Sequence, residues 1–289
     1  MFEKNVPQNS SSASPAIPYY HFSLLNPHSA HLAHAVFTRE GGQSKAPFDS
    51  LNVRYGIGDP DSSVMKNRQM MQDFFEREFL HNDDPASTSK TRLVSANQTH
   101  SDHVFSIHQN EPLEKQLPNM RHEAGDYEVD DVDAFVTDRR DISLLIQVAD
   151  CQAIILYEPV AGVLGMVHNG WRGSVQNIIG KTIAVMRDEF GADPVKIIAG
   201  IGPSIGPCCH YFTDPKSELP EEFHRYILAD ANNYRVDFLS ASRDQLMHAG
   251  VIAENIEFSN ICTYETTSEF YSYRHEKLTG RFGVMAALR

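Results

Sequence analysis

Residues 143–173, with the sequence SLLIQVADCQAIILYEPVAGVLGMVHNGWRG, decide how this chain folds. Three nearly continuous apolar runs lie at 143–148, 154–157 and 163–168, and a turn around Glu158-Pro159 separates the last two. Runs of this kind are typical of strands that are covered on both faces. Cys151 lies between the first two runs and His168 ends the third, so we expect a thiol and an imidazole at neighbouring strand ends.

The segments on either side of this stretch continue the mixture of strands and helices. The apolar periodicity predicts helices at 59–80, 174–190, 216–228 and 241–249, and further strands at 32–38, 92–96, 103–107, 134–137, 195–201, 260–263 and 281–287. The irregular alternation, without an exact repeat or a linker, predicts an α+β or layered α/β fold in a single domain, residues 19–289. Residues 1–18 are predicted to be a flexible tail and 109–131 a long polar loop.

Composition and charge limit the partners of the chain. The formal net charge of -13 disfavours general binding to nucleic acid or anionic membranes, because phosphate groups are repelled. No apolar run approaches the roughly 20 residues of a membrane span, and the first 18 residues lack the apolar core of a signal peptide. Four cysteines are too few and too unevenly placed for a disulfide scaffold, and a bridge between the adjacent Cys208 and Cys209 would be strained. We therefore expect a cytoplasmic protein.

A metal centre is the first interpretation of the residues that could carry chemistry. His100, in the stretch Asn97-Gln98-Thr99-His100, offers a third ligand beside Cys151 and His168. Two histidines and one cysteine without an obvious fourth ligand match a catalytic zinc site that keeps one position open. The long, irregular separations carry little weight by themselves, because buried cysteines and strand-end histidines are commonly core residues.

Two other interpretations of the same three residues stay open. Two histidines and a cysteine also describe a blue-copper centre with an axial methionine, and Met166 lies two residues before His168. The sequence has no His-x-His pair, which multicopper oxidases use to build a trinuclear cluster, and this weighs against oxygen chemistry. Alternatively, Cys151 is a metal-free nucleophile whose thiolate is favoured by a neighbouring histidine, as in cysteine hydrolases.

Several other residues are interpreted more simply. The predicted helix at 174–190 begins directly after Gly173, so its amide groups and dipole would point toward the candidate site. Cys208, Cys209 and His210 form a weaker candidate for a second thiol site, and Cys262 is interpreted as a small core residue. The arginines of Tyr271-Ser272-Tyr273-Arg274 and Thr279-Gly280-Arg281 are interpreted as solvated surface charge.

These stretches together resemble the multicopper polyphenol oxidase or laccase-domain family of the YfiH type, later described as purine nucleoside phosphorylases. The matching motifs run in the same order along the chain from about Phe37 to the C-terminus: Thr38 to Ser44, Leu51-Asn52, Asn67-Arg68, Gln98-Thr99-His100, Ala149-Asp150-Cys151, His168 to Gly173, Gly202 to Ile205, Ser272-Tyr273-Arg274 and Thr279-Gly280-Arg281. Departures from the family pattern are modest and remove no candidate ligand: Thr99, Ser101, Asn169 and His210 replace the usual residues.

The resemblance implies a four-layer α/β/β/α sandwich that forms one zinc-dependent catalytic domain, with zinc bound by His100, Cys151 and His168. It also implies phosphorolysis of adenosine, inosine, guanosine and methylthioadenosine to free base and pentose 1-phosphate, and deamination of adenosine. The implied partners are therefore a small-molecule nucleoside and phosphate, with the chain a monomer or a homodimer.

Roles for individual residues follow from this implied chemistry. Arg39, Arg172 and Asn52 are the predicted substrate-binding residues, with the two arginines as candidates for phosphate. Asp150 is a candidate for proton transfer, although its position next to Cys151 would point it to the opposite face of a strand. The competing classes are a copper-dependent polyphenol oxidase (laccase-like) and a cysteine hydrolase or peptidoglycan-precursor editing protein.

Overall fold

Two large β-sheets form the centre of the computed structural model, which describes residues 2–6, 17–80, 90–117, 126–230 and 233–289. The seven-stranded sheet has the order β1-β2-β3-β16-β8-β4-β6. Its strands are β1 (Glu3–Asn5), β2 (Tyr19–His21), β3 (Leu32–Phe37), β4 (Arg92–Asn97), β6 (Tyr127–Asp130), β8 (Ile142–Val148) and β16 (Phe282–Leu288). β4 runs parallel to both β6 and β8, and the other pairs are antiparallel.

The six-stranded sheet has the order β15-β11-β9-β10-β7-β5. Its strands are β5 (Val104–Ile107), β7 (Ala134–Thr137), β9 (Gln152–Glu158), β10 (Val163–Asn169), β11 (Ile198–Ile201) and β15 (Ile256–Phe258). β9 and β10 form the antiparallel hairpin predicted around Glu158-Pro159. The predicted central strands are therefore confirmed.

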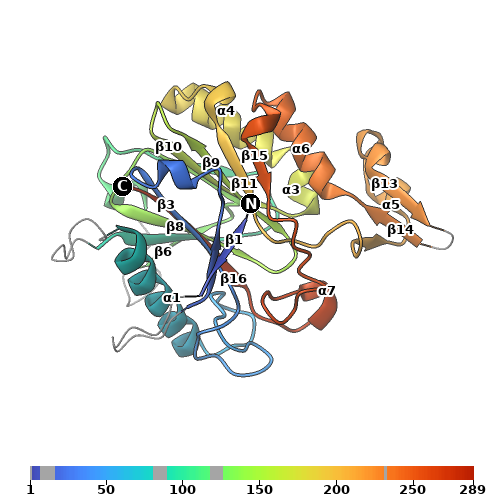
Figure 1. The fold of residues 1–289 in the computed structure, drawn as a ribbon, viewed down its shortest axis with the longest axis horizontal. Helices are drawn as coiled ribbons and strands as arrows, with labels where there is room; N and C mark the ends of the chain where they lie inside the picture. The colour runs from blue at the N-terminus through green and yellow to red at the C-terminus, as the bar shows by residue number, and fades with distance from the viewer. Residues whose placement is uncertain (1, 7–16, 81–89, 118–125, 231–232) are drawn as a thin grey trace.

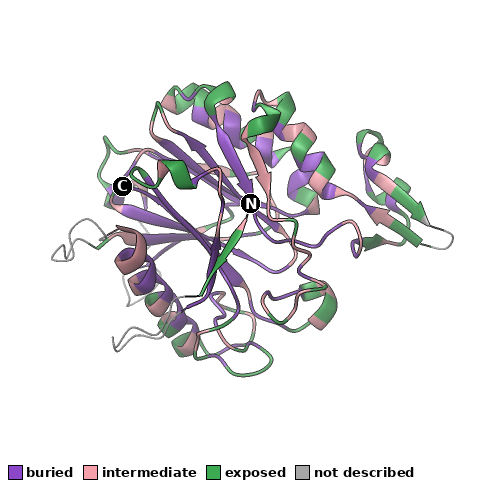
Figure 2. Ribbon diagram, in the orientation of Figure 1, coloured by how far each residue is buried: buried purple, intermediate pink, exposed green. Residues whose placement is uncertain are grey.

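Alternate residues of the central strands face two different cores. In β8, Leu144 and Ile146 point into the core between the two sheets, whereas Leu145 packs with Phe74 and Phe75 of the first helix on the outer face. The residues of β9 alternate in the same way. Ile155 faces the core between the two sheets, and Ile154 faces the core beneath the outer helices. Both faces of each strand are thus buried, which explains the continuous apolar runs of the sequence (Figure 2).

Helices cover the outer faces of both sheets (Figure 1). α1 (Asp61–Phe75), extended by a π turn at Glu76–Leu80, packs on the seven-stranded sheet. α4 (Ile178–Phe190) and α6 (Phe238–His248) pack on the six-stranded sheet. The layer order helix, sheet, sheet, helix confirms the predicted four-layer α/β/β/α sandwich.

The remaining elements are short. They are the helices α2 (Leu113–Gln116), α3 (Trp171–Val175), α5 (Pro215–Glu218) and α7 (Tyr273–Glu276), 3₁₀ turns at Asn26–His28, Pro194–Lys196, Glu221–Tyr226 and Ala253–Asn255, and a small sheet of β12 (Tyr211–Phe212), β14 (Asn233–Val236) and β13 (Ile227–Asp230). The small sheet and α5 project at one side of the molecule (Figure 1). Among the described residues, no helix is both long enough and apolar enough to cross a membrane.

The predicted flexible tail is wrong for its first residues. Glu3–Asn5 forms β1, which pairs with β2, and the ring of Phe2 stacks on that of Tyr20 with centroids 4.9 Å apart. A single apolar ring and three strand pairs anchor this segment, and the polar composition of residues 1–18 as a whole concealed them. Residues 7–16 lie outside the described residues.

Three other predicted elements also differ from the structure. The predicted loop 109–131 contains α2 and the edge strand β6, while residues 118–125 lie outside the described residues. The predicted helix 216–228 is divided among three elements: the short helix α5, the 3₁₀ turn at Glu221–Tyr226 and the start of β13. Pro220 interrupts the helical pattern between the first two. The predicted strand 260–263 forms only an isolated bridge from Cys262 to Ser204.

The predicted continuous helix 174–190 is two helices. Asn177, between α3 and α4, has φ 56°, and its side chain accepts the N–H of Gly180 to begin α4. Asparagine tolerates this left-handed conformation better than most residues, so the break has a low cost. The prediction that the long helix starts directly after Gly173 is therefore wrong, and its N-terminus does not begin at the candidate site.

Candidate metal centre

His100, Cys151 and His168 come together at one end of the two sheets. His100 follows β4, Cys151 directly precedes β9, and His168 lies near the end of β10, opposite Ala153 of β9. Their potential ligand atoms all lie within 4.8 Å of one another. The Cys151 Sγ is 3.7 Å from His100 Nε2, and the two imidazole rings meet edge to face at 4.9 Å.

The chain approaches this group closely at Gly170. A Cβ atom at this position would lie 2.7 Å from Cδ2 of His100 and 3.0 Å from Sγ of Cys151. Both distances are shorter than ordinary contacts, so any larger residue would displace two of the three side chains. The site is therefore shaped around a glycine whose φ of -79° is ordinary, and the reason for the glycine is space.

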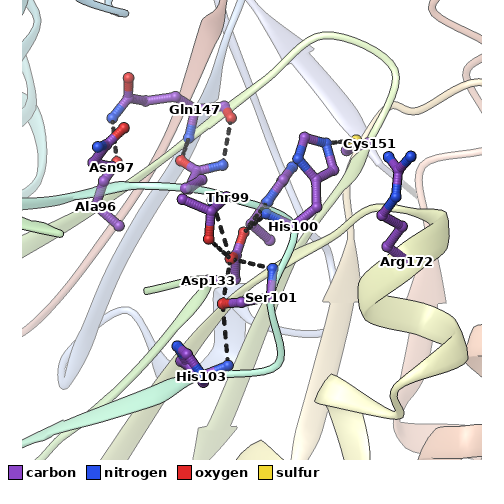
Figure 3. A network of polar contacts seen from close by, with 12 residues as sticks. Ala96, Asn97, Thr99, His100, Ser101, His103, Asp133, Gln147, Cys151 and Arg172 are labelled. Carbon is purple, nitrogen blue, oxygen red and sulfur yellow. Dashed lines mark hydrogen bonds and ion pairs between the residues drawn. The ribbon is translucent and has the colours of Figure 1, made fainter. Parts of the chain in front are cut away.

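Asp133, which was not predicted, holds His100 and His168 in place. Its contacts with His100 and Ser101 can be followed in Figure 3. Its Oδ1 accepts the Nδ1–H of His168 at 2.6 Å and the backbone N–H of His100 at 3.1 Å. Its Oδ2 accepts the backbone N–H and the hydroxyl of Ser101, each at 2.7 Å. A carboxylate behind a histidine fixes the tautomer and leaves Nε2 free to bind a metal. The donor set and its outer partner therefore fit a zinc ion.

The charges at the site suit metal binding. Burial raises the pKa of the Cys151 thiol, but the charge of His168 and hydrogen bonds with both histidines outweigh burial and lower the pKa to about 6. Burial lowers the pKa of His168, but Cys151 and Asp133 overcome it and raise the pKa to about 9. The thiolate form, which binds metals, is thus favoured at neutral pH, and His168 must release its Nε2 proton to become a ligand.

Two residues of the site have unusual backbone conformations: the candidate ligand His100, and Asp150, which directly precedes Cys151. His100 has φ 63° and Asp150 has φ 86°, in the region that non-glycine residues rarely occupy. Hydrogen bonds hold each one: Asp133 accepts the N–H of His100, while the Asp150 carboxylate accepts the Thr263 hydroxyl at 2.7 Å and the Arg274 N–H at 2.6 Å. Such conformations persist only where the surrounding structure enforces them, and they cluster at functional sites.

The three side chains lie in the wall of a cavity of about 510 Å³. Four arginines line this cavity: Arg54, Arg172, Arg274 and Arg281. It also receives Asp150, His210 and the aromatic side chains of Trp171 and Tyr273. In a chain whose net charge is -13, this local concentration of positive charge is suited to an anionic ligand.

Comparison with known proteins places this site in a family. The model of the family described as multi-copper polyphenol oxidoreductase laccase matches residues 33–289. The chain belongs to this family. The resemblance that the motifs indicated is thereby confirmed.

Individual relatives and a solved structure resemble this chain over most of its length. The chain is 30% identical over 250 residues to a protein named purine nucleoside phosphorylase YlmD from Bacillus subtilis (strain 168), covering 84% of each chain. It is 31% identical over 259 residues to purine nucleoside phosphorylase SCO2081 of Streptomyces coelicolor, covering 86% of this chain and 93% of that one. The crystal structure of YlmD from Geobacillus stearothermophilus superposes with a TM-score of 0.78 at 27% identity, covering 98% of both chains.

The predicted substrate-binding residues of this laccase-family chain are placed differently by the structure. Arg172, in α3, lines the cavity, and its guanidinium lies over the Trp171 ring at 4.4 Å. Arg39 does not line it: the guanidinium lies over Tyr271 and donates to the Asp49 and Thr267 carbonyls and to Glu276. The glycine-rich loop of Arg39 is therefore held to the C-terminal segment and does not reach the site.

Asn52 supports the cavity from behind and does not line it. Its buried Oδ1 accepts the backbone N–H of Arg54 at 3.1 Å and that of Arg281 at 2.9 Å, and its Nδ2 donates to Asp59 at 2.8 Å. One amide thus sets the backbone positions of two of the four cavity arginines. Arg54 was not predicted, and Arg281 was interpreted as surface charge, because its contact with Asn52 joins residues far apart in the sequence.

The structure keeps Cys208 and Cys209 together, as the predicted second thiol site requires, but changes the roles of His210 and Cys262. His210 lines the main cavity and is not part of a thiol site with Cys208 and Cys209. Cys262 is half-buried and lies beside those two cysteines instead of in the core. Met166 is fully buried in the core between the sheets.

Proposed function

We propose that this chain is a zinc-dependent purine nucleoside phosphorylase. In this proposal adenosine, inosine, guanosine or methylthioadenosine reacts with phosphate to give the free base and a pentose 1-phosphate, and adenosine is also deaminated. One observation carries the proposal: three potential metal ligands lie together in the wall of the cavity that four arginines line. The names of the relatives supply the reaction class.

His100, Cys151 and His168 would hold the metal. When bound, zinc supplies a Lewis acid that polarises the group it contacts and favours deprotonation of water. Asp133 keeps Nε2 of His168 directed to the ligand position by accepting the proton on Nδ1. Three protein ligands leave a coordination position for the substrate, which a structural site with four protein ligands would not.

The arginines would bind phosphate. In phosphorolysis a phosphate oxygen forms a bond to C1′ while the bond from C1′ to the purine nitrogen breaks, and the base leaves with the bonding electrons and gains a proton. Arg54 is held by Asn97 Oδ1 at 2.7 Å, and Arg281 by the carbonyls of Thr279 and Gly280 at 2.9 Å each. Guanidinium groups that are already fixed stabilise the charge of phosphate at little cost in reorganisation.

Asp150 positions other groups in this proposal. Each of its two oxygens already accepts a hydrogen bond, one from Thr263 and one from the backbone of Arg274. A carboxylate engaged in this way serves as an acceptor, and proton transfer by Asp150 would require one of these bonds to open. Trp171 and Tyr273 line the cavity, and each ring has an arginine over one face, so a purine would stack against the other face.

The direct test incubates the full chain with adenosine, inosine or methylthioadenosine, with and without phosphate, and identifies the products. We expect free base and pentose 1-phosphate only when phosphate is present, and inosine with ammonia from adenosine in either case. Cys151→Ser is the control and should form neither product. If the wild-type chain yields neither free base nor inosine, the proposed function is wrong.

Copper-dependent polyphenol oxidation is a second candidate, because the family description names it. Among the described residues, two groups have three or more potential metal ligands, and only the group with His100 and His168 contains histidine. A trinuclear copper cluster requires several more histidines together. Metal analysis of protein purified without added metal separates the two candidates: zinc at the centre supports phosphorolysis, and copper together with oxygen uptake on a phenol supports oxidation.

A further inference from the structure

A second group of potential metal ligands lies outside the cavity. The sulfur atoms of Cys208, Cys209 and Cys262 and a carboxylate oxygen of Glu265 all lie within 4.8 Å of one another. All three cysteines are free thiols. The proposed reaction uses none of these four side chains.

Local turns bring the four side chains to the same place. The N–H groups of Cys209 and His210 both donate to the carbonyl of Gly206, which closes a turn in which adjacent side chains lie on one side. In an extended strand, Cys208 and Cys209 would point in opposite directions. The N–H of Glu265 donates to the carbonyl of Cys262, so these two ligands, three residues apart, come from one turn as well.

The two turns are joined by the backbone around them. Ser204 and Cys262 form a parallel bridge, with the N–H of Ser204 donating to Ile261 and that of Thr263 donating to Ser204. The N–H of Gly206 donates to Sγ of Cys262 at 3.3 Å, a contact that favours negative charge on sulfur. A Cβ atom on Gly206 would lie 3.3 Å from Sγ of Cys208 and 3.4 Å from Cβ of Cys262, so a larger side chain would crowd both cysteines.

The donor set and its spacing fit zinc. Tetrahedral zinc with Zn–S bonds of about 2.3 Å places its sulfur ligands about 3.8 Å apart, so a group within 4.8 Å needs only a small contraction to bind. Thiolates select soft metals, and the carboxylate favours a divalent ion. Cys208, Cys262 and Glu265 line a cavity of about 300 Å³, Cys209 is buried behind them, and Glu265 is exposed, so an ion can enter from solvent.

We propose that Cys208, Cys209, Cys262 and Glu265 bind a second zinc ion that fastens two segments of the active-site wall. Four protein ligands close the coordination shell, which is typical of a structural site. His210, which follows Cys209, lines the catalytic cavity, and Thr263, which follows Cys262, donates to Asp150 in that cavity. An ion held by both turns would therefore fix the spacing of the residues on either side of the cavity.

Zinc stoichiometry of the full chain tests this proposal. The chain is purified with reductant, stripped of metal, given excess zinc and freed of unbound ion. We expect two zinc ions per chain for the wild type, one for Cys208→Ser/Cys262→Ser and one for Cys151→Ser. Ser259→Ala, which changes a residue that lines the same small cavity and is no ligand, should keep two. A single zinc in the wild type that Cys151→Ser loses, or two in the double variant, overturns the proposal.

A spectroscopic measurement covers the case in which the double variant fails to fold. Cobalt(II) replaces zinc, and each coordinating thiolate adds to a sulfur-to-metal charge-transfer band in the near ultraviolet. Cys151→Ser lacks the single thiolate of the first centre but keeps the three cysteines of the second group. Its charge-transfer band should therefore be stronger than the band that one thiolate alone would give. Absence of the band from Cys151→Ser overturns the proposal, as does a disulfide between Cys208 and Cys262 in protein purified with reductant. Neither result depends on whether the chain phosphorolyses nucleosides.

Discussion

The centre formed by His100, Cys151 and His168 and the thiol cluster around Cys208 and Cys262 use similar ligand atoms in different surroundings. The first offers three ligands, is supported from behind by Asp133, and lies in the wall of a cavity with four arginines. The second offers four ligands on two surface turns, beside a small cavity that no arginine lines. The number of protein ligands and the charge beyond them thus separate a site suited to chemistry from one suited to fastening.

Both groups contain cysteine thiolates, and the largest expected effect comes from removing the thiolate of the first centre. Cys151→Ser should abolish zinc binding there and reduce phosphorolysis to background, because a neutral hydroxyl replaces the only thiolate ligand. Cys208→Ser is the matched change at the thiol cluster, and it should leave one zinc at the first centre. Metal analysis and product assays on both variants check this. If Cys151→Ser retains wild-type turnover, the contrast between the two sites fails.

A smaller effect is expected from changing Asp133, the carboxylate that supports the two histidines of the first centre. Asp133→Asn should weaken zinc binding at that centre by roughly 10- to 100-fold, because His168 loses the acceptor that fixes its tautomer. Competition with a chelator measures this affinity. Asp131→Asn is the control, since Asp131 accepts the Thr99 hydroxyl but contacts no predicted ligand. Equal effects of the two changes would show that Asp133 does not act through the histidines.

The four arginines of the cavity distinguish the first site, and their role in binding phosphate is tested by changing Asn52, which positions two of them. Asn52→Ala should raise the KM for phosphate roughly tenfold, equivalent to about 1.4 kcal/mol, by freeing the backbone of Arg54 and Arg281. It should also lower the free energy of unfolding by about 1–3 kcal/mol, because buried hydrogen-bonding groups lose their partner. Steady-state kinetics and denaturant unfolding measure the two effects.

Asn255→Ala is the control for the Asn52 variant. Asn255 bonds the carbonyls of Val195 and Ile197 and contacts no residue of the cavity. It should lower stability without changing the KM for phosphate. A similar rise in KM in both variants would mean that lost stability, and not the position of the arginines, weakens phosphate binding.

The smallest effect is expected at the thiol cluster. Glu265→Gln keeps the shape of the side chain and three thiolates but removes one charged ligand, so we expect zinc affinity there to fall by roughly tenfold or less, about 1.4 kcal/mol. Zinc at the first centre should be unchanged. Competition titration in the Cys151→Ser background isolates the second site. A complete loss of zinc from Glu265→Gln would show that the carboxylate, and not the thiolates, dominates binding.

Much of the fold could be predicted because the strands carry their own signal. β8, β9, β10 and β16 are buried on both faces, and their apolar runs stand out in the sequence without knowledge of their neighbours. Helix boundaries were less predictable. Asn177 ends one helix and begins another through its own backbone conformation, which a periodic apolar pattern does not reveal.

Part of the candidate site could also be predicted. His100, Cys151 and His168 are of types that bind metals, and two of them lie at the ends of recognisable strands. Asp133 could not be selected from the neighbouring Asp130 and Asp131, because only the fold decides which carboxylate is buried behind His168. Arg281 was indistinguishable from surface charge for the same reason.

The sequence by itself determined the covered strands and the three residues proposed as ligands of the first centre. Both depend on short-range information: residue type, apolar pattern and the place where a strand ends. The tertiary structure alone decided which arginines face the metal centre, that Asn52 supports two of them, and that Cys262 joins Cys208 and Cys209. The contacts of Asn52 with Arg281 and of Cys262 with Cys208 and Cys209 link residues 53 or more positions apart, and how the sheets and turns pack sets these partners.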